Sequence, residues 1–284
     1  MAAVGVVTTP RVPGLPAALV KRLATAVVGI PLAVWVIAAA PRWVFALLVV
    51  ALSAAAAWEL TRLFERAGRP GYAWLAVVGA AGVTASFGAP GFPGTTVAVF
   101  TAALALALSL PVWLDGPPAV DPVTVTLLAI AYVGWSLGYG LLLANMPDGA
   151  DLLLFLVGTT WAGESAAFAV GSAVGRHPLA SSISPRKTVE GALGQLAASI
   201  VAAVGLGIWL LPQWSVTAMV SAGIVLGIVG QIGDLAESVI KRSLGAKDTG
   251  GLVPGHGGVL DRLDGLMFNA PALFYYASWV GGRG

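Results

Sequence analysis

The chain has 284 residues, of which 58% are hydrophobic and only 10% are charged. Soluble domains usually carry about 25% charged residues, so this chain has too few polar side chains to cover a water-facing surface. The absence of cysteine excludes disulfides and thiolate metal sites, and a net charge of +2 without a basic stripe argues against nucleic-acid binding.

Nine apolar segments have about the length that a membrane span needs, roughly 20 residues. In chain order they are 23–40, 43–60, 73–88, 95–113, 123–144, 152–174, 191–211, 216–236 and 265–281. Several are rich in Ala and Gly, which favours close helix packing in lipid. We therefore predict an all-α, polytopic membrane helix bundle with about nine transmembrane helices. An eight-span version remains open if 73–88 is re-entrant.

The distribution of Lys and Arg predicts the orientation of these spans. With a cytosolic N-terminus, 13 of the 15 basic residues fall in inner segments, and only Arg42 and Arg283 fall outside. The opposite orientation would invert this count and break the positive-inside rule. The apolar run after Lys21 and Arg22 loosely resembles a secretion signal, but further apolar segments follow at once, so we expect an uncleaved first span.

Polar residues divide the chain. They are sparse in the first half, where Glu59 and Arg62 lie one helical turn apart and are expected to pair at a span end, and they become dense from Glu164 to Asp264. We accordingly expect three regions. Residues 1–22 form a cytosolic N-terminal segment, 23–150 a transmembrane scaffold and 151–284 a transmembrane catalytic region.

The densest polar stretch runs from Gly233 to Gly265. On a helix, Asp234, Ser238 and Lys241 share one face, and a glycine-rich loop further on would let backbone N–H groups approach a polyanion. Carboxylates beside basic residues suit Mg²⁺ held between protein and phosphates. A solvated loop that only sets the topology would explain the basic residues, but not the acidic Asp234, Glu237, Asp248, Asp261 and Asp264.

This stretch resembles the signature of the phosphatidate cytidylyltransferase family. The matching positions are Ser238, Lys241, Arg242, Lys247, Asp248, Pro254, His256, Gly257, Gly258, Asp261, Arg262 and Asp264. One departure is Val253, where the family usually has Ile, Leu or Phe. Because the residue types and their spacings agree together, the resemblance is far more specific than a short glycine motif.

Two further stretches resemble the same family. Residues 183–191 match its S-P-K-K-T/S-W-E-G element, with Arg186 in place of Lys and Val189 in place of Trp; a basic loop with a helix N-cap is the alternative interpretation. Residues 161–168 match less closely, with Glu164 in place of Asp and Phe168 in place of Tyr. Glu164 lies within an apolar helix, where a carboxylate usually faces the bundle interior. These departures leave open the alternative that the chain is a paralogue with altered lipid preference.

The resemblance and the residue chemistry together assign expected roles. The expected catalytic residues are Asp234, Lys241, Arg242, Lys247, Asp248, His256, Asp261, Arg262 and Asp264. The expected substrate-binding residues are Ser184, Arg186, Lys187, Thr188, Glu190, Ser238, Gly257 and Gly258. The expected metal ligands are Asp234, Asp261 and Glu164. The expected cofactor is Mg²⁺, and a second cation remains open.

The resemblance implies that the phosphate oxygen of phosphatidate attacks the α-phosphorus of CTP, giving CDP-diacylglycerol and diphosphate. The expected partners are CTP, phosphatidic acid and membrane lipids, and a homodimer remains open. The expected location is the inner (plasma) membrane, with the site facing the cytosol. Alternatives are a CTP-dependent transferase or kinase for a polyprenyl or archaeal-type lipid, and a cation-coupled transporter. The transporter is disfavoured because the acidic residues crowd the inner span ends rather than the midplane.

Overall fold

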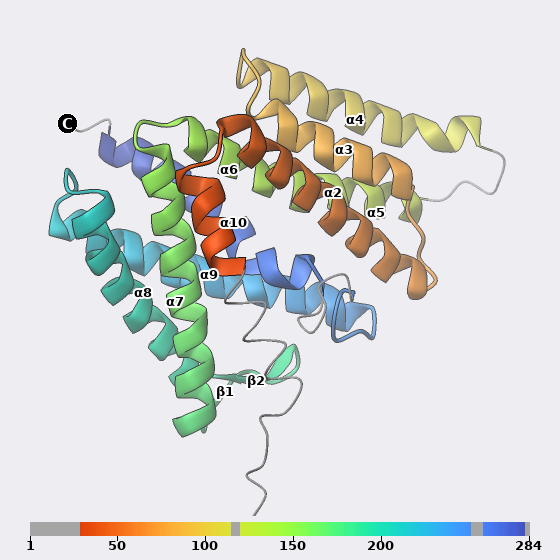
Figure 1. Ribbon diagram of the computed structural model, residues 1–284. Helices are drawn as coiled ribbons and strands as arrows, with labels where there is room; N and C mark the ends of the chain where they lie inside the picture. Colours follow the sequence, from red (N-terminus) through yellow and green to blue (C-terminus); the bar gives the residue numbers. More distant parts are fainter. Residues whose placement is uncertain (1–28, 115–119, 251–257, 282–284) are drawn as a thin grey trace, which may run out of the picture.

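The computed structural model describes residues 29–114, 120–250 and 258–281, and their fold is all-α apart from one small hairpin (Figure 1). The helices are α2 (Arg42–Arg66), α3 (Ala73–Ser86), α4 (Gly94–Trp113), α5 (Asp121–Ala129), the π-helix η1 (Ile130–Trp135), α6 (Ser136–Asn145), α7 (Gly149–Val174), α8 (Val189–Leu210), α9 (Val216–Ser243) and α10 (Leu260–Gly281). The strands of the hairpin are β1 (Pro178–Ala180) and β2 (Ser184–Thr188). A short helix over Gly29–Ala38 precedes α2.

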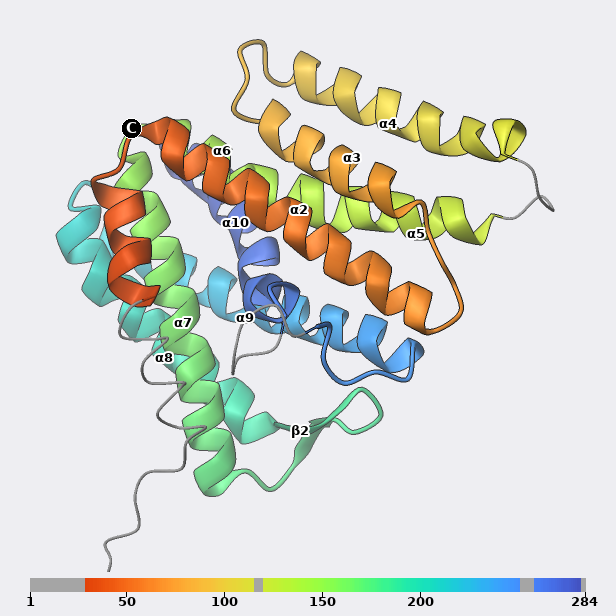
Figure 2. The same ribbon diagram turned by 45° about the vertical axis from the view of Figure 1, so that its right-hand side comes forward.

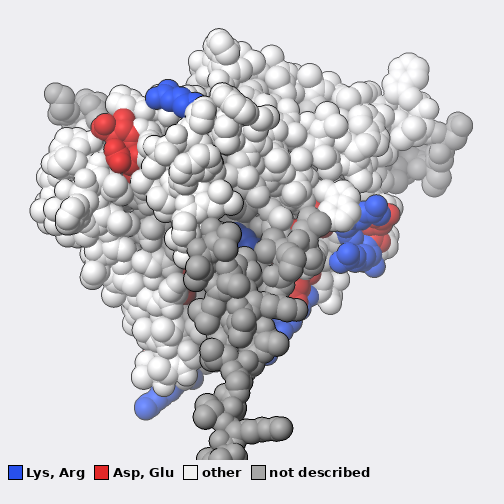
Figure 3. Space-filling model, viewed as in Figure 1, with Lys and Arg blue, Asp and Glu red and all other residues white. Residues whose placement is uncertain are grey.

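The described residues contain six helices that are long and apolar enough to cross a membrane: α2, α4, the continuous α5–η1–α6, α7, α8 and α9. Large apolar side chains stand exposed on them, such as Trp209 at 86% and Val201 at 73% on α8. In the view of Figure 3 most of the visible surface carries no charged side chain, and the charged side chains form a few separate groups. These are the features of a multi-pass membrane protein. The nine-span count and the cytosolic N-terminus stay predictions.

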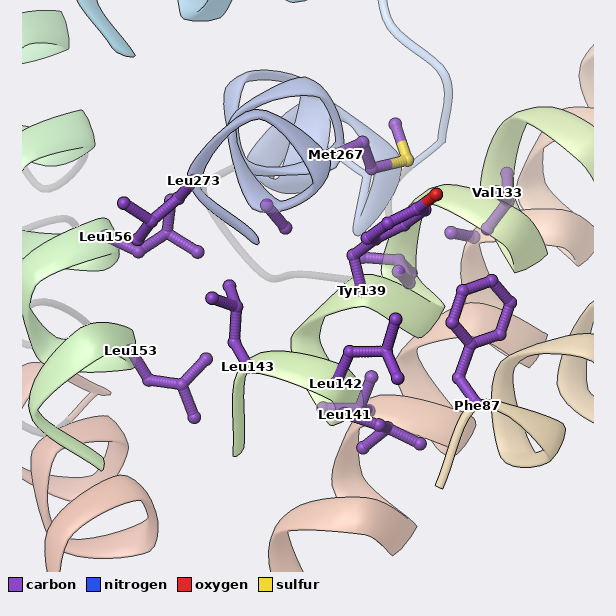
Figure 4. Packing of buried hydrophobic residues seen from close by; sticks show 14 of the residues in the cluster. Phe87, Val133, Tyr139, Leu141, Leu142, Leu143, Leu153, Leu156, Met267 and Leu273 are labelled. Carbon is purple, nitrogen blue, oxygen red and sulfur yellow. The ribbon is translucent and has the colours of Figure 1, made fainter. Parts of the chain in front are cut away.

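Two groups of helices meet at α10. The first contains α2, α3, α4 and the α5–η1–α6 helix, and the second contains α7, α8 and α9 (Figures 1 and 2). Helix α10 packs against α9, α6, α7 and α2, so it contacts both groups. Figure 4 shows Leu273 of α10 beside Leu156 of α7, with Leu143 of α6 completing the contact. The position of α10 therefore depends on helices from both halves of the chain.

Glycines allow the closest helix contacts. A Cβ at Gly134, in η1, would lie 2.7 Å from the Cα of Ala80 on α3. A Cβ at Gly233, on α9, would lie 2.7 Å from the carbonyl oxygen of Asp264 on α10. Small residues at such crossings let backbones approach, which is the main source of packing energy between helices in lipid.

Two local expectations are corrected by the structure. The segment between α7 and α8, expected as a loop, contains the antiparallel β1–β2 hairpin, in which Pro178 pairs with Thr188 and Ala180 with Ser184. Arg62 does not pair with Glu59: its Nη1 lies 2.5 Å from Glu65 Oε2, because Glu65 is the exposed acid on its own helix face. Glu59 points into the protein, where only 1% of it is exposed.

We expect Gly134→Ala to lower the thermal unfolding temperature of the detergent-solubilised protein. The added methyl group would overlap the Ala80 backbone, and overpacking of this kind costs about 1–3 kcal/mol. The matched control is Gly140→Ala on α6, where nothing lies within 4 Å of the added Cβ. Because Ala favours a helix by up to about 1 kcal/mol over Gly, this control should be neutral or stabilised. Equal unfolding temperatures for the two variants would contradict the packing described here.

Candidate active site

The β1–β2 hairpin is fixed to the first turn of α8 by two side chains. The Thr188 hydroxyl accepts the N–H of Gly191 at 3.1 Å and caps α8. Glu190 accepts the N–H groups of Arg176 and His177 at 3.1 and 3.2 Å, and its other oxygen lies 2.6 Å from His177 Nδ1. An acid in the first turn is also favoured by the helix dipole. Glu190, expected to bind substrate, thus anchors the base of the hairpin in this structure.

The hairpin places Lys187 against α9. Its Nζ lies 2.5 Å from Asp234 Oδ2, and both side chains are partly exposed. They line a cavity of about 600 Å³ between α7, α8 and α9, together with Glu164 and Thr188. The rest of the wall is largely apolar and includes Phe168, Leu179 and Leu235. We call the part of the wall that holds Lys187 and Asp234 the charged end of the cavity, and the apolar rest of the wall suits hydrocarbon.

Three carboxylates from three helices lie near this charged end. Glu164 of α7 interacts electrostatically with Asp234 of α9 and Asp264 of α10, and Asp264 interacts with Asp234. The backbone of Gly265 lies directly against the Glu164 carboxylate, so α7 and α10 are in contact here. Lys187 interacts with both Glu164 and Asp264. Like charges repel strongly in a low-dielectric interior. The positive charge of Lys187 reduces the repulsion among these carboxylates.

Lys241 forms the second charged centre and joins α9 to α10. Its Nζ donates to Glu237 Oε1 at 2.8 Å and to Asp261 Oδ1 at 2.9 Å. Asp261 also accepts the N–H groups of Thr249 at 3.1 Å and Gly258 at 2.9 Å. The bond to the N–H three residues earlier is the one that an acidic capping-box residue makes. Two carboxylates thus balance the charge of Lys241. The Asp261 carboxylate accepts three hydrogen bonds, one from Lys241 and two from backbone N–H groups.

The other predicted site residues are spread around these two centres. Arg242 donates from Nε to the carbonyl of Ile183 and from Nη1 to that of Ala246, both at 3.0 Å, so it holds the hairpin turn against the end of α9. Lys247, Asp248 and Arg262 are exposed, Ser238 is buried, Ser184 is half-buried and Arg186 lies at the cavity. His256 and Gly257 lie outside the described residues.

Sequence reasoning missed a carboxylate from the first half of the chain. Glu59 Oε2 accepts the N–H of Leu260, the first residue of α10, at 2.9 Å. A Cβ at Gly250 or Gly258 would lie 2.7 or 2.6 Å from its oxygens. Gly258, expected to bind substrate, is buried against Glu59. The signal in the sequence is the single acid of the apolar segment 43–60, although the spacing alone predicts that it pairs with Arg62.

Three polar side chains near the cavity and the acids were also missed. Gln195 and Gln231 line the cavity, and Gln231 donates to the carbonyl of Ala192 at 2.9 Å. Tyr132, in the π-helix, has a buried hydroxyl that lacks a hydrogen-bond partner among the described residues. It interacts electrostatically with Asp234, Glu237 and Asp264. A π-bulge that carries such a group often marks a functional position.

The six long apolar helices define a multi-pass membrane protein. The cavity among them has both charged and apolar walls, which suit an amphipathic anion. Comparison with known proteins identifies the family: residues 20–280 match the model described as the cytidylyltransferase family. The chain therefore belongs to this family, which confirms the resemblance found in its sequence.

Individual relatives agree with this assignment. The chain is 43% identical over 134 residues to a phosphatidate cytidylyltransferase of Synechocystis sp., covering 46% of this chain and 45% of that protein. It is 43% identical over 157 residues to a phosphatidate cytidylyltransferase of Brucella suis, covering 52% and 54%. It is 40% identical over 152 residues to an uncharacterized protein, YnbB, of Escherichia coli, covering 54% and 50%. The chain thus spans about half the length of the curated relatives it matches.

We expect Lys241→Met to destabilise the protein by about 3–5 kcal/mol, because it leaves the fully buried Glu237 and the largely buried Asp261 without their cation. Adding Glu237→Gln should recover part of this loss. The matched control, Arg62→Met, breaks an exposed ion pair and should cost less than about 1 kcal/mol. Unfolding of the detergent-solubilised variants measures both effects, and similar losses for Lys241→Met and Arg62→Met would contradict the buried centre.

Proposed function

We propose that the protein is a phosphatidate cytidylyltransferase, which transfers the cytidylyl group of CTP to phosphatidic acid and releases diphosphate. The single observation that carries this proposal is the Lys187–Asp234 pair at the charged end of an otherwise largely apolar cavity. Membership of the cytidylyltransferase family supports the type of reaction, and the names of the relatives support the lipid acceptor.

The cavity suits a substrate with an anionic head and apolar tails. Lys187 would attract a phosphate, and exposed Phe168 and half-buried Leu235 would lie beside hydrocarbon. A cavity between membrane helices lets the lipid enter without leaving the bilayer, while the nucleotide enters from water. The exposed basic residues Arg186 and Lys247 lie in segments next to the span ends, where a triphosphate would arrive.

In the proposed reaction a phosphatidate oxygen attacks the α-phosphorus of CTP, and the bond to the diphosphate breaks in line with the attack. No covalent protein intermediate is required, so the side chains orient the two phosphates and balance charge. Lys187 would move from Asp234 to a phosphate oxygen. Thr188 accepts the N–H of Gly191 and so keeps its hydroxyl hydrogen to donate. Arg262, which interacts with Glu164, would hold a second phosphate near the acidic cluster.

We propose Mg²⁺ as the cofactor, held at the acidic cluster. The hard carboxylate oxygens of Glu164, Asp234 and Asp264 suit this ion, and each belongs to a different helix. In the part of the chain that the structure describes, no three His, Asp or Glu side chains form a ready metal site. The ion would therefore take its remaining ligands from phosphates and water, and would neutralise the charge that develops on the leaving diphosphate. An ion at Asp261 would first have to displace Lys241.

We further propose that the site faces the cytosol from the inner (plasma) membrane. The hairpin, the end of α9 and the start of α10 gather the basic residues Arg186, Lys187, Lys241, Arg242 and Arg262. A concentration of Lys and Arg in short segments between spans favours the cytosolic side. CTP is available on that side, and phosphatidate can reach the site from the inner leaflet.

The decisive experiment determines which phosphate of CTP is transferred to the lipid. Purified protein with phosphatidate, Mg²⁺ and α-labelled CTP should give labelled lipid, and γ-labelled CTP should give labelled diphosphate only. Asp234→Asn should lower kcat/KM by about a hundredfold or more, because one charge that orients the cation and Lys187 is lost. Glu65→Gln, an exposed change on α2, should leave the rate unchanged.

Label transferred from the γ-position to the lipid would contradict the proposal, since it would show kinase chemistry. Turnover with a polyprenyl or archaeal-type phosphate but none with phosphatidate would contradict the proposed acceptor. Full activity of Asp234→Asn would remove this residue from the reaction.

A further inference from the structure

Glu59 is a buried carboxylate that none of the expected roles includes. It lies on α2, 201 residues before Leu260, whose N–H it accepts at 2.9 Å. Only 1% of Glu59 is exposed, and its second oxygen, Oε1, has no hydrogen-bond partner among the described residues. A carboxylate buried at a helix N-terminus satisfies an N–H group that has no partner within the helix and is favoured by the helix dipole.

The neighbours of Glu59 belong to both ends of one segment, which runs from Thr249 to Leu260. Gly250 packs against Oε1 at one end, and Gly258 packs against Oε2 at the other. A side chain at either glycine would overlap the carboxylate, since an added Cβ would lie 2.7 Å from Oε1 at Gly250 and 2.6 Å from Oε2 at Gly258. Contact with Glu59 thus leaves no room for a side chain at Gly250, and contact with both Glu59 and Thr249 leaves none at Gly258.

Asp261 holds the same two ends from within α10. It accepts the N–H of Thr249 at one end and the N–H of Gly258 at the other, and Lys241 fixes its carboxylate. Both of these ends therefore lie between a carboxylate from α2 and a carboxylate from α10. Arg262 and Asp264 follow on the first turn of α10, so their positions depend on where this helix begins.

We propose that Glu59 is a positioning residue: it holds Thr249–Gly250 and Gly258–Leu260, with the start of α10, against α2, and so places Asp261, Arg262 and Asp264 for the reaction. The catalytic part of this inference rests on the proposed function. It makes α2 a component of the site rather than part of a generic scaffold. The contact itself, however, can be tested without turnover.

The test of the contact uses cysteine labelling, because the chain has no cysteine of its own. Thr249 is 1% exposed and its hydroxyl lacks a partner among the described residues, so Thr249→Cys places a small, buried reporter beside Glu59 without breaking a side-chain hydrogen bond. Ser199→Cys on α8, also at a position 1% exposed, reports on the rest of the bundle. A maleimide reagent is applied to each reporter in detergent, with Glu59 intact or replaced.

Glu59→Ala should raise the labelling rate of the Thr249→Cys reporter by roughly ten- to a hundredfold, as expected for the loss of a buried hydrogen bond to a charged group. The rate of the Ser199→Cys reporter should not change. Glu59→Gln keeps an acceptor oxygen for the Leu260 N–H and should restore protection to within about threefold. Glu65→Ala, an exposed change on the same helix, should have no effect on either reporter.

An unchanged rate for the Thr249→Cys reporter in Glu59→Ala would overturn the clamp. An equal rise for both reporters would also overturn it, since the effect would then be a general loss of stability. Failure of Glu59→Gln to restore protection would overturn the role assigned to the acceptor oxygen.

Cytidylyl transfer is then measured on the same variants without reporter cysteines. Glu59→Ala should lower kcat by about tenfold or more with a smaller change in the KM for CTP, because misplaced groups slow the chemical step more than they weaken nucleotide binding. Glu59→Gln should recover most of kcat. Normal kcat in Glu59→Ala would overturn the positioning role. If the unmodified protein makes no CDP-diacylglycerol, the proposed function fails, and the labelling result still decides whether Glu59 clamps the segment.

Discussion

Lys241 links α9 and α10, two of the three helices that carry the acidic residues of the site. Its ammonium group lies between Glu237, one turn earlier on α9, and Asp261, at the start of α10. Burying three charged groups is costly, and only their mutual pairing and the N–H donors around Asp261 offset that cost. Because the two helices cannot separate without leaving a buried charge unpaired, this triad fixes the relation between Asp234 and Asp264.

The charged centre at the cavity has a different character. Lys187 and Asp234 pair at a cavity and remain partly exposed, whereas Lys241 is nearly enclosed. A partly exposed pair gains little from its attraction and separates readily, which supports the proposed exchange of the Asp234 carboxylate for a phosphate. The buried centre therefore has the features of a structural support, and the exposed centre those of a binding site. The two lysines are alike in chemistry and differ in burial, with side chains 25% and 13% exposed for Lys187 and Lys241.

Several features followed from the sequence with little ambiguity. Apolar runs of span length marked the positions of the helices from α2 to α10, because a backbone in lipid must satisfy its own hydrogen bonds. The expected ends differ from the observed ones most at α2 and α9, which extend to Arg66 and Ser243, beyond the apolar runs that end at 60 and 236. The spacing from Ser238 to Asp264 identified the family, and Glu164 was expected to face the bundle interior, where it contacts Gly265. Local patterns of this kind can be recognised without knowledge of the fold.

The pairing of charges did not follow from the sequence. Arg62 could reach either Glu59 or Glu65 along its helix, and only the packing of α10 against α2 decided that Glu59 turns inward. The β1–β2 hairpin was missed because its strands are very short and depend on the Glu190 contacts and on Arg242 from α9. The sequence by itself determined the helices, the family and the acids and bases available. The tertiary structure decided which of them meet, because contacts across 201 residues, as between Glu59 and Leu260, depend on helix packing and not on local spacing.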